Sequence, residues 1–88
     1  MELPGAELVE QGIVDLREHR ETKEALLVSI GSPRLQMLGI DVPEPVAQPE
    51  RRLYELLARE NADAAHGRYN ALVRRLTSFE RAASIGAR

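Results

Sequence analysis

The sequence contains no cysteine and no tryptophan, and only two tyrosines and one phenylalanine among its 88 residues. Without cysteine the chain cannot form disulfides, a thiolate zinc site or a thiol nucleophile. No apolar run approaches the roughly 18 residues that a membrane span needs, and the opening Met-Glu-Leu-Pro lacks the basic and apolar regions of a secretory signal. We therefore expect a cytoplasmic protein that does not enter a membrane.

Patterns that mark catalytic or ligand sites are also missing. The two histidines, His19 and His66, fit no zinc-binding pattern, and Asp63 together with His66 supplies fewer ligands than a tetrahedral site needs. The glycines form no phosphate-binding loop. Glu18, Glu21 and Glu24 are predicted to face solvent, whereas acid–base catalysis needs a group that burial or a close charge perturbs. We expect no enzyme, no bound metal and no cofactor.

The composition is otherwise that of a folded chain, with 43% hydrophobic and 30% charged residues. This is enough apolar material for a single small domain over residues 1–88. The periodicities found along the chain are all helical. We predict an all-α fold: a small bundle of about five helices, two of them short, with a proline-rich connector near residues 41–49.

The front half is predicted to hold three helices. Apolar residues at helical spacing predict the first over residues 4–20, with Pro4 at its first position. Residues 25–30 are apolar on nearly every side, which predicts a helix at the centre of the core, and Thr22 can cap its beginning.

Glycine and proline set the predicted boundaries that follow. We expect Gly31 to end the central helix, Ser32 and Pro33 to begin a short third one, and Gly39 to stop it.

The back half begins after the connector, in which three of nine residues are proline. Pro49 is predicted to open a helix that runs to about Glu60, and Asn61 or Asp63 to start the last helix. In that helix six apolar residues follow a 4-3-4-3-4 spacing, the stripe of a packed or coiled helix. The stripe predicts either an internal core face or a homodimer seam, and consists of Ala65, Tyr69, Leu72, Leu76, Phe79 and Ala83.

Charge is distributed unequally between the two halves. Residues 1–24 have a net charge of −4 and the last 38 residues a net charge of +4. Opposite charges attract within one fold or across a dimer. Arg68 and Arg75 flank the apolar stripe, so we expect them near carboxylates of the first helix, in the same chain or in a second one.

These features favour a non-catalytic protein–protein interaction module or small subunit. We expect it to associate with itself as a homodimer, with the acidic first helix of one chain near the basic last helix of the other, or to bind an unidentified protein. The predicted interface consists of Tyr69, Leu72, Leu76, Phe79, Arg68 and Arg75.

The alternative is a small DNA-binding regulator with a degenerate helix-turn-helix at residues 23–40. With Gly31 at the turn, apolar residues fall where that motif keeps them: Leu26, Ile30, Met37 and Ile40. Arg34 is the only cation that the recognition helix would present, and the front half is net negative, whereas DNA binding needs several cations. Nucleic acid is therefore the lesser of the two expected partners.

Overall fold

The computed structural model describes residues 3–86 and contains four α-helices in that range. They are α1 (Ala6–Arg17), α2 (Lys23–Met37), α3 (Pro49–Glu60) and α4 (Ala65–Gly86). No strand occurs among these residues, which confirms the all-α class. The expected number of about five helices is wrong, because the two short helices predicted in the front half are one.

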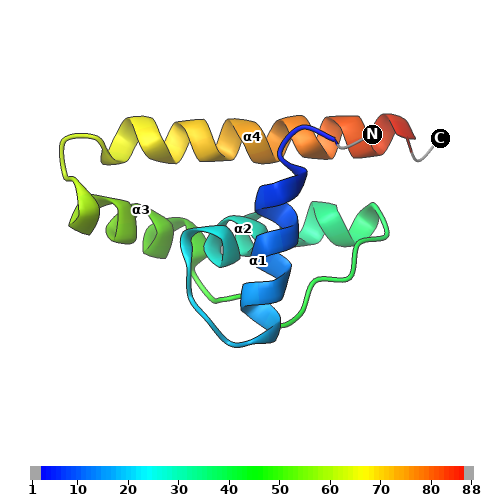
Figure 1. The fold of residues 1–88 in the computed structure, drawn as a ribbon, viewed down its shortest axis with the longest axis horizontal. Coiled ribbons are helices and arrows are strands. Elements are labelled where there is room, and N and C mark those ends of the chain that lie inside the picture. The colour runs from blue at the N-terminus through cyan, green and yellow to red at the C-terminus, as the bar shows by residue number, and fades with distance from the viewer. Residues whose placement is uncertain (1–2, 87–88) are drawn as a thin grey trace.

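The longest helix, α4, extends along one side of the molecule, and the other three helices lie on its opposite side (Figure 1). In Figure 1, α1 crosses in front of α2 and is steeply inclined to α4, while α3 lies beside the first half of α4. The molecule measures 40 × 25 × 20 Å, with a radius of gyration of 12.6 Å. The helices of the front and back halves share one hydrophobic core.

The core is centred on α2, as its apolar sequence predicts. Ala25, Leu26, Leu27 and Val28 have no exposed surface. They are covered by α1, α3 and α4, all of which pack against α2. A helix that is enclosed on several sides needs apolar residues around most of its circumference, and this is the pattern of the segment.

The predicted break in α2 at Gly31 is wrong, because the helix continues through Gly31 and Pro33 to Met37. A proline in a helix interior costs about 3 kcal/mol, whereas full burial of one leucine contributes about 1.5–3 kcal/mol. Burial of Leu35, which the continued helix brings into the core, offsets much of that cost. Gly31 serves packing: a Cβ there would lie 3.0 Å from the Leu76 methyl groups of α4.

The predicted stop at Gly39 is confirmed. Gly39 has a φ of +87°, a left-handed conformation that favours glycine. Its N–H donates to the Gln36 carbonyl oxygen, and the Ile40 N–H donates to that of Leu35. This pair of bonds is a Schellman motif, which satisfies carbonyl groups at the end of a helix.

The first helix is shorter than the predicted 4–20. It begins at Ala6, after Gly5 with a φ of +76°, so Pro4 is not its first residue. It ends at Arg17 in a second Schellman motif: the N–H groups of His19 and Arg20 donate to the carbonyl oxygens of Leu16 and Asp15. His19 occupies the left-handed position, with a φ of +60°. Because that position usually holds glycine, the sequence carried no clear signal for this end.

Residues 41–48 form no helix and join α2 to α3. Val42 is buried, and the N–H of Val46 donates to the hydroxyl oxygen of Ser29 at 3.0 Å. The connector is thus held against α2. The helix predicted from Pro49 to Glu60 is confirmed at both ends.

Candidate functional site

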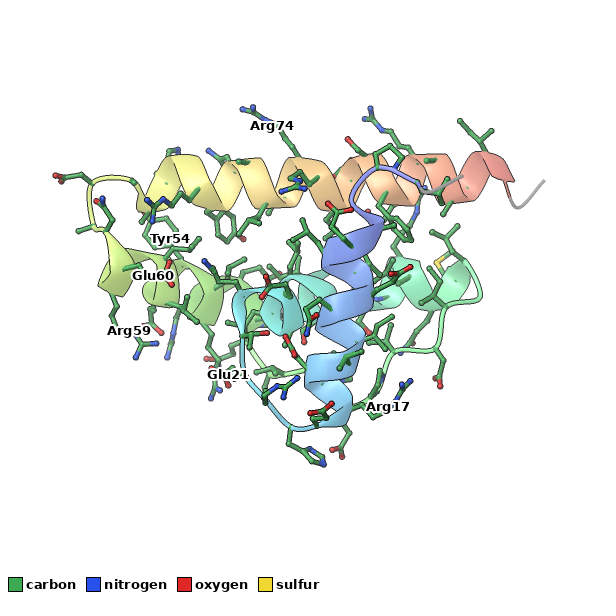
Figure 2. The ribbon with its side chains drawn as sticks, in the orientation of Figure 1. Arg17, Glu21, Tyr54, Arg59, Glu60 and Arg74 are labelled. Carbon is green, nitrogen blue, oxygen red and sulfur yellow. The ribbon has the colours of Figure 1, made fainter. Side chains whose placement is uncertain are left out.

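The structure divides the six predicted interface residues into an inner and an outer group. Leu76 and Phe79 belong to the core of the single chain, with 4% and 7% of their surface exposed. Tyr69 is half-buried, and its ring centroid lies 5.9 Å from that of Tyr54. Figure 2 shows Tyr54 in the space between α3 and α4. The α4 stripe therefore supplies the internal core along much of its length.

The other three predicted residues, Arg68, Leu72 and Arg75, line one groove. We call it the junction groove because all four helices contribute to it, and its volume is about 260 Å³. Its lining residues are Leu8 from α1, Lys23 and Glu24 from α2, Leu57 from α3, and Arg68, Ala71, Leu72 and Arg75 from α4. The sequence predicted Arg68, Leu72 and Arg75 as interface residues and missed Ala71 and the contributions of the other helices, which depend on how those helices cross.

The floor of the junction groove is apolar. Leu57 is fully buried beneath it, while Leu8 and Leu72 are half-buried and reach its surface. Leu72 lies within the α4 stripe, and its partial burial shows that the other helices do not cover it completely. Covering an apolar floor that is open to solvent with another molecule is favourable, because it removes apolar surface from water.

The rim of the junction groove carries three cations. Arg75 lies 2.6 Å from a carboxylate oxygen of Glu7 in α1, as the charge distribution predicted for a single chain. Arg68 and Lys23 approach Glu60 of α3 at 4.0 and 3.5 Å. Arg68 therefore meets a carboxylate of α3 and not one of the first helix.

These rim pairs are weakly held, because the side chains involved are about half exposed. Their exposed fractions run from 41% for Glu60 to 58% for Glu7. Exposed ion pairs contribute about 0–1 kcal/mol each. An incoming carboxylate can thus exchange with Glu7 or Glu60 at small cost.

A second polar cluster, around Asp15, joins α1 to α2. The Asp15 side chain is only 3% exposed, although the residue lies on a surface helix. It accepts hydrogen bonds from the Thr22 hydroxyl, from Gln11 at 2.9 Å and from Arg20 at 2.8 Å. The bond from Thr22, followed by those from Arg20 and Gln11, lowers the pKa of Asp15, although burial opposes that shift.

The role of the Asp15 cluster is structural. Thr22 donates to Asp15 and accepts from the Ala25 N–H at 3.1 Å, so one carboxylate orients the N-cap of α2. The capping role of Thr22 was predicted and is confirmed, whereas the burial of Asp15 was missed. All seven acids of residues 1–24 look like surface residues in the sequence. Asp15 is buried because the turn after α1 encloses it.

Other titratable groups are dispersed over the described surface. Burial raises the pKa of Glu80 in α4, and the charge of Arg34 opposes that rise. Burial and the charge of Glu50 raise the pKa of Tyr69. The ring of His66 lies 3.2 Å from the Asn70 amide, and both side chains belong to exposed α4 surface. Among residues 3–86, no three histidine or carboxylate side chains are grouped as metal ligands.

The expected helix-turn-helix at residues 23–40 is wrong as a structural element. Its turn was placed at Gly31, which lies inside the continuous helix α2. Met37, assigned to an apolar position of the motif, is 83% exposed. The segment has no second helix that could enter a DNA groove.

Comparison of the chain with family models, with curated proteins and with solved structures finds no match. Within residues 3–86, no helix combines the length and hydropathy that crossing a bilayer requires.

Proposed function

We propose that this protein is a non-catalytic protein–protein interaction module that associates with itself through the junction groove. The expectation that it acts in the cytoplasm is part of this proposal. The observation that carries it is the groove itself, in which an apolar floor from three helices is bordered by two arginines and a lysine.

This arrangement agrees with the general anatomy of protein interfaces. Such interfaces have an apolar centre that becomes fully buried and a polar rim that stays in contact with water, and arginine is enriched in them. In the junction groove, Leu72 and Leu8 supply the apolar centre, and Arg68 and Arg75 supply the rim.

The distribution of the α4 stripe shifts the centre of the proposed interface. Leu76 and Phe79 are already covered by the chain's own helices, so they support the groove from within. Leu72 is the residue of the stripe that both lines the groove and remains half-buried. We therefore place Leu72 at the apolar centre of the interface, with Arg68 and Arg75 beside it.

The test is the mass of the protein in solution, measured by sedimentation velocity from low to high micromolar concentration. We expect a dimer for the unaltered chain and a monomer for Leu72→Glu. Ser78→Glu is the matched control, because Ser78 is exposed elsewhere on α4, and it should leave the dimer intact. A wild-type chain that stays monomeric at high micromolar concentration would refute self-association.

Association with a different protein is the second form of this proposal. Affinity capture from the native cell, repeated after nuclease treatment, should then recover a partner in near-stoichiometric amount. That partner should be lost with Leu72→Glu and kept with Ser78→Glu. Equal recovery with both variants would show that the junction groove is not the binding surface.

Duplex DNA is the second candidate partner, and a different surface favours it. Arg74 and Arg81 lie on the exposed side of α4 and form no ion pair with another described residue. Figure 2 shows Arg74 directed away from the three other helices. Phosphate contacts by such residues would make binding fall steeply with salt. Salt-dependent binding to duplex DNA that is lost in Arg74→Glu/Arg81→Glu would favour this candidate over the first.

A further inference from the structure

We infer that the junction groove binds the outer face of α1 from a second copy of this chain, in a closed dimer. This inference rests on the self-association proposed above and names the surface that enters the groove.

The outer face of α1 contains an exposed valine between acids. Val14 is 39% exposed, and Glu10 and Glu18 are exposed four residues before and after it. At about 100° per residue, both glutamates lie within about 40° of Val14 around the helix. We call this set the acidic face of α1: Glu7, Glu10, Val14 and Glu18.

The groove shows the complementary order along α4. Arg68 precedes Leu72 by four residues and Arg75 follows it by three. With a rise of about 1.5 Å per residue, the two arginines are about 10 Å apart along the axis, and the two glutamates that flank Val14 are about 12 Å apart. An apolar residue thus lies between two like charges on each surface, at nearly the same spacing and with opposite sign.

The two surfaces carry net charges of opposite sign. The side chains that line the junction groove, Lys23, Arg68 and Arg75 against Glu24, have a net charge of +2, and Glu7 and Glu60 pair with these cations at the rim. The acidic face has three glutamates against Arg17 at its edge and Arg20, which pairs with Glu18, for a net charge of −1. Complementary charge of this kind orients the partners and raises the rate of association.

The acids of this face differ in whether they already form an ion pair within the chain. Glu10 forms no ion pair with another described residue, whereas Glu18 lies 2.8 Å from Arg20 and Glu7 lies 2.6 Å from Arg75. All of these side chains are exposed, so exchanging one exposed pair for another costs little. Burial of Val14 against Leu72 and Leu8 supplies an apolar gain that the separate chains lack.

The two surfaces adjoin each other on one helix, which allows the dimer to close. Leu8 lines the groove, and Glu10 and Val14 lie about half a turn and just under two turns further along α1. A two-fold axis between the surfaces would place the acidic face of each chain in the groove of the other. Each contact would then occur twice, and no binding surface would remain for a third chain.

The decisive experiment mixes two variants of opposite charge. The first, Arg68→Glu/Arg75→Glu, has an acidic groove, and the second, Glu10→Arg/Glu18→Arg, has a basic α1 face. In either homodimer both contacts place like charges together, and such juxtaposition weakens association by about 100-fold or more. In the mixed dimer both contacts are again between opposite charges.

We therefore expect each variant alone to sediment as a monomer and the equimolar mixture to form a dimer. The mixed dimer should have a dissociation constant within about tenfold of that of the wild type, since apolar contacts are retained and only charge positions are exchanged. Association of the mixture should weaken as salt rises. Arg74→Glu/Arg81→Glu is the matched control, because it makes the same charge change away from the groove.

The outcomes separate this inference from the proposed function. If Leu72→Glu breaks the wild-type dimer but both charge variants still form dimers alone, the acidic face is not the occupant, although self-association stands. If both variants are helical monomers and their mixture stays monomeric, the inference is also overturned. If the wild type is monomeric, self-association fails and this inference fails with it.

Circular dichroism should show that every variant keeps the helical content of the wild type. If a double variant unfolds, the single pair Arg68→Glu and Glu10→Arg provides the same comparison with half the change in charge. Restored association in that mixture supports the inference, and its absence refutes it.

Discussion

At the scale of single residues, the conformation between α1 and α2 depends on the buried carboxylate of Asp15. Three side chains donate hydrogen bonds to it, and through Thr22 it supports the beginning of α2. Removing one partner of a buried hydrogen bond leaves the others unsatisfied, which costs more than the bond itself contributes. Several hydrogen bonds of this region therefore depend on the single carboxylate of Asp15.

We expect Asp15→Asn to lower the free energy of unfolding by about 1–3 kcal/mol at pH 7, because an amide offers one acceptor oxygen in place of two. The pKa of Asp15 is lower in the folded chain than its ordinary value of 3.8. The carboxylate therefore stabilises the fold above that value and loses this effect as the pH falls below it. Urea unfolding at pH 7 and pH 3 should show the difference between wild type and variant shrinking in acid.

Glu10→Gln is the control for this measurement, because Glu10 is exposed on the same helix. It should change the free energy of unfolding by no more than about 0.5 kcal/mol. A difference between wild type and Asp15→Asn that is the same at both pH values would contradict the assigned role.

At the scale of secondary-structure elements, the crossing of α1 over α2 depends on Gly12. A Cβ at this position would collide with the Glu24 carbonyl oxygen and with a methyl group of Val28, both in α2. In the sequence, Gly12 is only a glycine in a helix interior, which lowers helix propensity. In the structure it is the place where two helix backbones approach each other.

Gly12→Ala should lower the free energy of unfolding by about 1–3 kcal/mol, because α1 must move away from α2 to admit the methyl group. Gly67→Ala is the matched comparison, since a Cβ in that helical position has no neighbour within 4 Å. It should raise the free energy of unfolding by about 0.5–1 kcal/mol through the better helix propensity of alanine. Chemical denaturation should show that the two variants change the free energy of unfolding in opposite directions. A loss of stability in both would argue against the close crossing.

The end of α1 provides a second prediction for an element. His19 has a φ of +60°, and a residue with a side chain pays about 1–2 kcal/mol for a left-handed conformation. His19→Gly should therefore raise the free energy of unfolding by up to about 1 kcal/mol, the rest being offset by the greater freedom of glycine in the unfolded chain. His19→Ala should give no such gain in the same denaturation experiment.

At the scale of the whole molecule, residues of the α4 stripe differ in whether they contribute to folding or to the proposed association. Leu76 is enclosed by the chain's own helices, whereas Leu72 borders the junction groove. The same substitution at these two positions thus separates folding from association.

Leu76→Glu should unfold the chain, because an unpaired charge in the core costs more than the marginal stability of a domain of this size. Leu72→Glu should keep the helical circular dichroism spectrum and lose only association. Circular dichroism and sedimentation velocity on the same samples measure both effects. A folded Leu76→Glu variant would contradict the internal packing of the stripe.

Sequence patterns were sufficient to predict the all-α class, the helix from Pro49 to Glu60 and the central position of residues 25–30, of which 25–29 are buried. They also predicted the apolar stripe of α4 but left open whether it was an internal face or a dimer seam. These features follow from local patterns, since apolar periodicity and proline act within a few turns of one segment. The sequence also placed Arg68, Leu72 and Arg75 in its predicted interface, together with three residues that do not line the groove.

The features that depend on neighbouring helices became clear only from the packing of the folded chain. A glycine that ends a helix and a glycine that allows close packing look the same in a sequence. The role of Gly31 is clear only from the position of Leu76 beside it in the structure. The burial of Asp15 required the turn after α1, and the junction groove required four helices to meet. Which face of an apolar stripe is covered and which is left open depends on helix crossings, and no local pattern encodes them.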